Sequence, residues 1–264
     1  MTLIHLITLA LIQGITEFLP VSSSAHLILV PQFLGKADQG LMIDVAAHGG
    51  SLLAVMLYFR KEVVQIFCGF FDAVCAKKTN DRQFFFLIVV ATVPGLIIGG
   101  LLHFYASDIF RHTTVIAVTS LIFGVLLWWV DVKYPTQKKL SHLTIQSAFK
   151  IGLAQILAFI PGTSRSGITM TMARGLGFDR ISAARFSMFL SMPIIGAAVC
   201  IYLLQAITKS SSFYLGFEFF AVMGLSFIAS IISIHWLLKF VRRYSFKIFA
   251  VYRILLSLVI IALL

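Results

Sequence analysis

Residues 13–28 read QGITEFLPVSSSAHLI, and this stretch places an amide, a carboxylate, three hydroxyls and an imidazole inside an otherwise apolar segment. Pro20 lies near its centre, and apolar residues lead into the stretch and out of it. Polar groups are costly at membrane depth unless they face a partner or water. Their concentration at one place therefore indicates a functional site.

The composition around this stretch is that of a membrane protein. The chain has 264 residues, of which 59% are hydrophobic and 12% charged, and its mean hydropathy is +0.99. A water-soluble domain needs more polar surface than this composition supplies. Apolar runs of about 20 residues predict an all-α integral membrane protein and not a β-barrel. The net charge of +11 comes from basic residues at the ends of these runs, which indicates membrane topology and anionic lipid, with no nucleic acid as partner.

Two apolar runs are interrupted in the middle. Residues Thr2–Val30 are broken at Pro20, and residues Ser147–Leu176 are broken at Pro161-Gly162. Each half is too short to cross a hydrocarbon core of about 30 Å at a rise of about 1.5 Å per residue. Each run is therefore predicted to enter the membrane and turn back as a re-entrant, broken-helix pair. The six runs that are long enough to cross are Leu41–Phe59, Phe84–Phe104, Thr113–Val130, Ala183–Leu204, Phe217–Phe240 and Phe246–Leu264.

The two halves of the chain follow the same plan. Residues 1–140 and 141–264 each contain one broken pair followed by three predicted spans, within one membrane domain. At an offset of 141 the prolines of the two breaks coincide, and Ser23 falls on Ser164. Because three spans is an odd number, the halves would have opposite orientations. This is the inverted-topology repeat of many transporters, in which discontinuous helices meet near the midplane.

The loop charges predict an orientation. If the first broken pair enters from one side, that side receives only Lys36, Arg111 and Lys209, whereas the opposite side receives sixteen of the 21 basic residues. The remaining two, Arg165 and Arg253, fall within apolar segments. Because cytoplasmic loops are rich in Lys and Arg, the basic side is predicted to be cytoplasmic and both termini lie outside.

The second break complements the chemistry of the first. It reads AFIPGTSRSGITMTMARG from Ala158 to Gly175, and its Arg165 has the opposite charge to Glu17. Small polar residues at the start of each following helix leave backbone N–H groups for an anion, and a guanidinium can hold phosphate oxygens with two hydrogen bonds. The polar residues that the two breaks contribute are Gln13, Glu17, Ser22, Ser23, Ser24 and His26, and Thr163, Ser164, Arg165, Ser166, Thr169 and Thr171.

Several roles stay open from the residues alone. Gln13 and Glu17 share a helical face and both can reach a divalent cation. Glu17, His26 and a serine can form a set of nucleophile, base and orienting group, but Glu17 can also be only the structural partner of Arg165. His48, in AAHGGS, belongs either to the site or to close helix packing.

The motifs QGITEFLPVSSSAH at 13–26 and PGTSRSG at 161–167 resemble those of the undecaprenyl pyrophosphate phosphatase family, also known as bacitracin-resistance proteins. The resemblance extends to DVAAHGGSLLAV at 44–55 and FAVYR at 249–253. It implies hydrolysis of undecaprenyl diphosphate to undecaprenyl phosphate and inorganic phosphate. This reaction recycles the lipid carrier for peptidoglycan synthesis and protects against bacitracin. It also implies a divalent cation, Mg²⁺ or Ca²⁺. The protein would be a multi-pass protein of the bacterial inner membrane with its active site facing the periplasm, which is also the side where the loop charges place both termini.

The resemblance also implies roles for individual residues. The positions that match catalytic residues are Glu17, Ser23, His26 and Arg165. The predicted substrate-binding residues are Ser22, Ser164, Ser166 and Thr169, together with Gln13, Ser24 and Thr163. Gln13 stands where the family often has glutamate, so the cation is predicted to be held by Glu17 and substrate oxygens. Either Ser23 attacks the terminal phosphorus, activated by Glu17 or His26, or His26 attacks or activates water.

A second function class fits the same pattern. Inverted repeats with broken helices are transporter architecture, so the alternative is a transporter or flippase of a lipid phosphate or another anion. The membrane and the lipid diphosphate are the predicted partners, and a homodimer is one assembly that the sequence allows.

Overall fold

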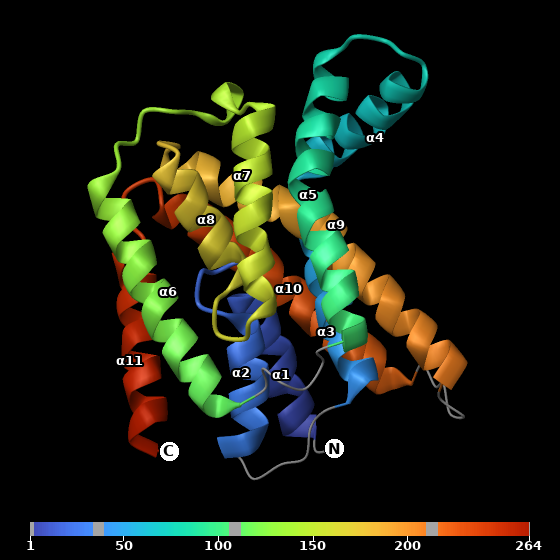
Figure 1. Ribbon diagram of the computed structural model, residues 1–264. Coiled ribbons are helices and arrows are strands. Elements are labelled where there is room, and N and C mark those ends of the chain that lie inside the picture. Colours follow the sequence, from blue (N-terminus) through green and yellow to red (C-terminus); the bar gives the residue numbers. More distant parts are fainter. Residues whose placement is uncertain (1–2, 34–39, 106–111, 210–215, 264) are drawn as a thin grey trace.

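The computed structural model describes residues 3–33, 40–105, 112–209 and 216–263 (Figure 1). Lys36 and Arg111, which enter the orientation prediction, lie outside these ranges. The described residues form helices joined by turns, without an extended strand, and the one β-bridge joins Lys138 to Phe178. The chain is therefore all-α, as predicted.

The helices follow one another in the order that the apolar runs predict, with one addition. They are α1 (Leu3–Thr16), α2 (Ser23–Phe33), α3 (Leu41–Tyr58), α4 (Arg60–Val74), α5 (Asn80–Tyr105), α6 (Thr113–Lys133), η1 (Leu140–His142), α7 (Ile145–Gln155), η2 (Ile156–Phe159), α8 (Arg165–Gly175), α9 (Arg180–Lys209), α10 (Phe217–Phe240) and α11 (Lys247–Leu263).

Four helices in the described ranges, α5, α6, α9 and α10, are each long and apolar enough to cross a membrane. Helices α3 and α4 make a fifth candidate if this pair, bent by 87°, is counted as one span. Helix α11, the sixth predicted span, has 17 residues, at the short end of what crosses a bilayer. The chain is a multi-pass membrane protein, and the count of six spans stays a prediction.

Helix α4 is the added element. The sequence places its basic residues in a loop, whereas Arg60–Val74 form a helix that turns sharply away from α3. One face of α4 packs on α5 through Gly69, whose added Cβ would meet the backbone of Asp81, and Glu62 pairs with Arg185 of α9. Charged residues and exposed phenylalanines share this helix, which is typical of a helix in the membrane interface.

Both predicted breaks are present, each between two short helices, and their re-entrant path through a membrane stays a prediction. Helices α1 and α2 flank the first break, and α7 with η2 and α8 flank the second, and none of these helices is long enough to cross alone. Each first helix packs on a long helix of the other half of the chain, α1 on α10 and α7 on α5. Glycines allow this close approach: a Cβ on Gly14 would lie 2.6 Å from Ala229 Cβ, and one on Gly152 would clash with the Ala91 carbonyl. The first helix of each broken pair therefore packs on a long helix of the other half. This reciprocal packing fits an inverted repeat, which stays a prediction.

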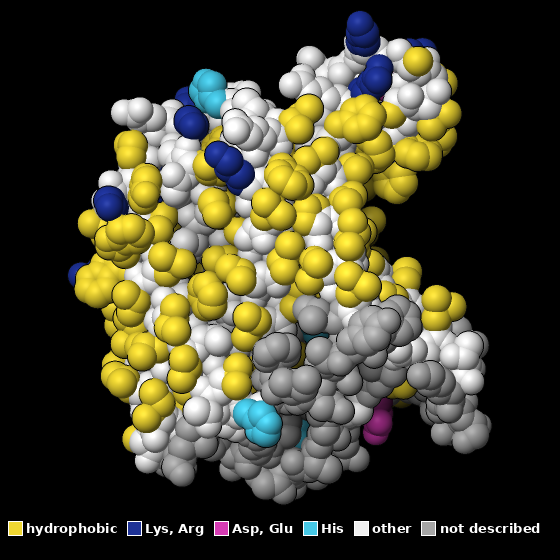
Figure 2. Space-filling view, viewed as in Figure 1, with side chains coloured by type: hydrophobic (Ala, Val, Ile, Leu, Met, Phe, Trp, Pro, Cys, Tyr) yellow, Lys and Arg dark blue, Asp and Glu magenta, His cyan; other side chains and the backbone are white. Residues whose placement is uncertain are grey.

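Basic residues gather at one end of the described bundle. Helix α1 begins and α11 ends at the end opposite α4 (Figure 1). On the face shown in Figure 2, Lys and Arg side chains gather toward the α4 end, and hydrophobic side chains cover the middle. At the α4 end, Asp131 of α6 accepts from the fully buried Arg174 Nε at 2.8 Å and from Arg180 Nε at 2.9 Å. This network fixes the far end of α8, and therefore the direction in which its first residues point.

Candidate active site

The two breaks have the same backbone geometry at the start of the following helix. Ser22, just before α2, has φ 72°, and Ser164, just before α8, has φ 70°. Each of these serines lies 3.2 Å, oxygen to oxygen, from the hydroxyl two residues later, Ser24 or Ser166. A non-glycine residue in this region is strained, and such strain concentrates at functional sites. The matching serines are 142 residues apart, so the offset of 141 that aligns the two prolines does not align the residues that begin the following helices.

The charged groups of the two breaks meet at Glu17. Arg165 Nη2 donates to Glu17 Oε1 at 2.9 Å, which joins the two halves of the chain. The other carboxylate oxygen, Oε2, accepts from Ser23 Oγ at 2.7 Å and from Gln13 Nε2 at 2.8 Å. Glu17 is 8% exposed, so the ion pair offsets the cost of burying both charges. The predicted pairing of Glu17 with Arg165 is present.

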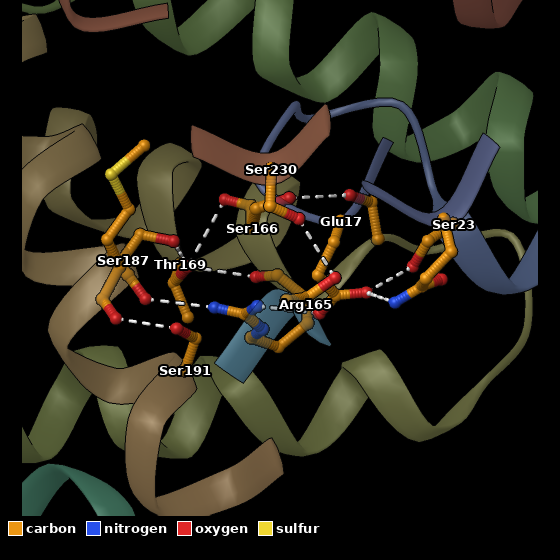
Figure 3. A network of polar contacts seen from close by, with 12 residues as sticks. Glu17, Ser23, Arg165, Ser166, Thr169, Ser187, Ser191 and Ser230 are labelled. Atoms are coloured by element: carbon orange, nitrogen blue, oxygen red, sulfur yellow. Dashed lines mark hydrogen bonds and ion pairs between the residues drawn. The ribbon is translucent and has the colours of Figure 1, made fainter. Parts of the chain in front are cut away.

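Arg165 is held from its other side by α9. Its Nη1 donates to the Ser187 carbonyl at 2.9 Å, and Thr169 Oγ1 donates to the Ser187 hydroxyl at 2.8 Å (Figure 3). Thr169, one turn into α8, also contacts the Arg165 carbonyl. The guanidinium is therefore fixed between a carboxylate and a carbonyl before any substrate arrives. Thr169 holds α8 against α9 through its hydrogen bond to Ser187.

The second break is fixed by helices from outside the pair. Thr119 Oγ1 of α6 donates to the Pro161 carbonyl at 2.6 Å. The buried Arg253 of α11 donates through Nη2 to the carbonyls of Gly162 and Thr163 at 2.8 and 2.9 Å. Gly162 has φ +90°, and a Cβ there would meet Thr119, so this tight turn requires glycine. Arg253, a basic residue within a predicted span, thus stabilises the turn that presents Arg165.

A cavity of about 180 Å³ opens between the two breaks. One wall carries the polar groups and the other is apolar, from η2 and α9. Its lining residues are Glu17, Ser23, Ser24, His48, Gln155, Ala158, Phe159, Ser164, Arg165, Ser166, Ile194, Ile195 and Ala198. Helices α2 and α8 both begin at this cavity, and helix N-termini favour anions. The arrangement suits a small anionic group attached to an apolar chain.

The structure places the predicted site residues in two groups. Glu17, Ser23, Ser24, Ser164, Arg165 and Ser166 line the cavity. Gln13, Ser22, His26, Thr163 and Thr169 are not among the lining residues, although Gln13 contacts Glu17. His26 turns toward α11: its Nδ1 donates to the Ser22 carbonyl at 2.7 Å, and its Nε2 accepts from Tyr252 Oη at 2.5 Å. Both ring nitrogens of His26 are thus engaged away from Ser23.

Two other side chains occupy the cavity wall. His48 of α3, whose role the sequence leaves open, has Nδ1 bonded to the Asp44 carbonyl at 2.8 Å and lines the cavity. Gln155, the last residue of α7, also lines it and is absent from the predicted set. Its place six residues before Pro161 is the sequence signal that could identify it.

The described residues contain no cluster of three or more His, Cys, Asp or Glu side chains that could hold a metal ion. Glu17 is the one carboxylate on the cavity wall, and the buried Gln13 Oε1 has no hydrogen-bond partner within the described ranges. Carboxylate and amide oxygens suit a hard divalent cation, which often completes its shell with water and substrate phosphates. The donor set therefore fits a cation shared with a bound diphosphate.

Comparison with known proteins gives one consistent relationship. Residues 6–259 match the family model described as bacitracin resistance protein BacA. An undecaprenyl-diphosphatase of Saccharophagus degradans is 46% identical over 257 residues, covering 97% of this chain and 96% of that protein. Undecaprenyl-diphosphatase 1 of Pseudoalteromonas translucida is 45% identical over 263 residues and covers 97% of both chains. Over nearly its whole length, and through the two breaks that build the cavity, the chain belongs to the bacitracin resistance protein BacA family.

Proposed function

We propose that this chain hydrolyses undecaprenyl diphosphate to undecaprenyl phosphate and inorganic phosphate. One observation carries the proposal: Ser23 and Arg165, from the two facing breaks, share the carboxylate of Glu17 beside a cavity within the membrane domain. Hydroxyl, carboxylate and guanidinium are the groups that phosphoryl transfer needs as nucleophile, base and charge stabiliser. The proteins named undecaprenyl-diphosphatase above support the same substrate.

In the proposed mechanism, Ser23 Oγ attacks the terminal phosphorus as its proton passes to Glu17 Oε2. The bond from that phosphorus to the bridging oxygen breaks, and the lipid monophosphate leaves. Water then attacks the phosphoserine, releasing inorganic phosphate and restoring the Ser23 hydroxyl, while the proton on Glu17 leaves with the products. Arg165 and the N-termini of α2 and α8 stabilise the charge on the phosphoryl oxygens. His26 has no direct step in this scheme, because both of its ring nitrogens are engaged elsewhere.

A divalent cation, Mg²⁺ or Ca²⁺, belongs to the proposal. Glu17 and the Gln13 amide oxygen would hold it together with substrate oxygens. When bound, such an ion neutralises phosphate charge and polarises the phosphorus centre.

Apolar cavities continue from the site and support a lipid substrate. A cavity of about 140 Å³ between α5 and α9 shares Phe159, Ile194 and Ala198 with the site. It meets a groove of about 460 Å³ beneath α4 at Leu96. We place the isoprenoid tail along this route, which leads from the polar wall to the lipid-facing surface.

The proposal includes the orientation and biological role. The α4 end, rich in basic residues, would face the cytoplasm, so the opposite end, with both termini, would face the periplasm, and we propose that the active site opens on that side. This orientation is tested in intact cells by labelling single cysteines that are added at one end of the bundle or the other. The reaction would return the lipid carrier to peptidoglycan synthesis, and excess enzyme would confer bacitracin resistance. A homodimer is one assembly open to this enzyme, and the mass of the protein in detergent tests it.

The competing function is transport of a lipid phosphate or another anion, which the packing of broken helices against the opposite half also suits. The deciding experiment measures phosphate release from undecaprenyl diphosphate by purified protein in detergent, where no gradient exists. We expect release by the wild type, loss on chelation, and loss in Glu17→Ala and Arg165→Ala. A folded wild type that releases no phosphate with Mg²⁺ or Ca²⁺ present would favour transport.

A further inference from the structure

Gln155 has an unusual environment. Its side chain is 2% exposed and lines the cavity that also holds Glu17 and Arg165. Neither Nε2 nor Oε1 has a hydrogen-bond partner among the described residues. Burying an amide without partners costs roughly 1–3 kcal/mol. A buried and unpartnered amide on the wall of a reaction site therefore indicates a ligand that completes it.

A comparison of the two breaks explains why this amide lacks a protein partner. Gln13 lies before the first break as Gln155 lies before the second, at the offset of 142 that also relates Ser22 to Ser164. In the first break, Gln13 Nε2 donates to the carboxylate of Glu17 at 2.8 Å. The second break has no equivalent carboxylate, because Ala158 and Phe159 occupy the positions 141 and 142 residues after Glu17.

The surroundings hold the Gln155 amide in place. A Cβ added to Gly95 of α5 would lie 3.0 Å from Gln155 Nε2 and 3.2 Å from Ile194 Cδ1, so the glycine makes room for the amide. Gly95 and Ile194 also line the apolar cavity that leads away from the site. Gln155 is therefore at the junction of the polar cavity and the apolar route, where the diphosphate would join its isoprenoid chain.

We infer that Gln155 is a substrate-binding residue whose amide N–H groups donate to phosphoryl oxygens of the lipid diphosphate. The inference rests on the proposed function and adds a recognition group that the two sequence motifs do not contain. Arg165 and the helix N-termini approach the anion from the breaks, and Gln155 approaches it from α7. The Gln155 amide is an uncharged donor, so it can fix the position of the anion without forming an ion pair with Glu17, as a Lys or Arg side chain would.

The test is the variant Gln155→Leu, which keeps the approximate size of the side chain and removes its hydrogen bonds. The control is Gln146→Leu, an exposed glutamine on the same helix. Binding of farnesyl diphosphate, a C15 isoprenyl diphosphate, is measured by calorimetry in a Ser23→Ala background, and KM and kcat are measured with Ser23 present. We expect Gln155→Leu to weaken binding and raise KM by about 10-fold or more, the value of one hydrogen bond to a charged group. The control should be unchanged, and Gln155→Asn should recover part of the binding.

The outcomes separate this inference from the proposed function. Phosphate release by the wild type with equal binding by Gln155→Leu would overturn the inference and leave the function standing. If the wild type releases no phosphate but Gln155→Leu still binds farnesyl diphosphate more weakly, the proposed function is overturned and the inference about Gln155 stands. If Gln155→Leu does not fold, Gly95→Ala replaces it, since its Cβ would crowd the amide. Unchanged binding and KM in folded Gly95→Ala would then count against the inference.

Discussion

Ser23 Oγ lies 2.7 Å from Oε2 of Glu17, and this hydrogen bond joins the hydroxyl at the start of α2 to a carboxylate on the other side of Pro20. The geometry is that of a nucleophile and its base. The other oxygen of the carboxylate is occupied by Arg165, so substrate phosphate that attracts Arg165 would release Glu17 to accept the serine proton.

Replacement of Ser23 by alanine should remove the nucleophile. We expect Ser23→Ala to lower the rate of phosphate release by about 10³-fold or more, because loss of a nucleophile in a cooperating set removes most of its effect. Ser141→Ala, an exposed serine in η1, is the control and should keep wild-type activity. Rapid quench with diphosphate labelled in its terminal phosphate should leave label on Ser23 of the wild type. Label on a histidine, or an active Ser23→Ala enzyme, would contradict the prediction.

Removal of the His26 imidazole should have a much smaller effect. His26 bridges the Ser22 carbonyl and Tyr252 Oη, so we expect it to stabilise the turn before α2 and not to contact the reacting atoms. We expect His26→Gln and Tyr252→Phe to lower kcat by less than about 10-fold, against the 10²–10⁴-fold that is typical of a general acid or base. The measurement is kcat over a range of pH for both variants. A loss as large as that of Ser23→Ala would assign His26 to the chemistry.

The two histidines show where sequence reasoning reaches its limit. His26 lies within the polar motif and His48 lies outside it, yet His48 lines the cavity and His26 does not. The sequence locates both on helices, but the rotation of α2 about its axis depends on packing against α6 and α11, through contacts distant in sequence such as Ala25 and Leu29 with Ile116 and Ile260. Whether a residue belongs to the polar motif therefore predicts its place in the cavity less well than the rotation of its helix does.

Other features follow directly from the sequence. The breaks at Pro20 and Pro161, the helices between them and the pairing of Glu17 with Arg165 are predictable, because polar groups in apolar runs must find one another. Helix α4 is not, since its basic residues are equally typical of a cytoplasmic loop and its helical form depends on contact with α5. The offset of 142 that relates the serines and the glutamines of the two breaks is hidden, because the two prolines align at an offset of 141.

The cation prediction can be tested at Gln13. The variant Gln13→Glu replaces the donor 2.8 Å from Glu17 Oε2 by a second carboxylate, and a divalent cation would offset the repulsion between them. We expect the Mg²⁺ concentration for half-maximal phosphate release to fall by about 10-fold, equivalent to about 1.4 kcal/mol of binding. Gln146→Glu is the control for charge alone. An unchanged Mg²⁺ dependence in a folded Gln13→Glu enzyme would argue against a cation at Glu17.

The contact between α1 and α10 predicts an effect on stability. An added Cβ at Gly14 would lie 2.6 Å from both Ala229 Cβ and the Ser226 carbonyl, whereas one at Gly224 of α10 would meet nothing within 4 Å. Gly14→Ala should lower the free energy of unfolding by about 1–3 kcal/mol through overpacking. Gly224→Ala should raise it slightly, because alanine favours a helix over glycine by about 1 kcal/mol. Thermal unfolding in detergent compares the two, and equal midpoints would mean that α1 does not pack closely here.

The proposed route for the isoprenoid tail predicts a change in chain-length preference. Gly100 lines the cavity between α5 and α9, and an added Cβ there would meet nothing within 4 Å, so Gly100→Leu should fill the route without disturbing the fold. Ile232→Trp is the control, because it fills a separate apolar groove of about 480 Å³ between α1 and α10.

The readout is the ratio of kcat/KM for undecaprenyl diphosphate to that for farnesyl diphosphate. Gly100→Leu should lower this ratio by about 10-fold, since loss of one or two buried methylene-rich contacts costs about 1–3 kcal/mol. The short substrate should react normally because its diphosphate still reaches Ser23, Glu17 and Arg165. If Ile232→Trp lowers the ratio and Gly100→Leu does not, the tail follows the groove between α1 and α10, and the polar cavity must open toward that side when substrate binds.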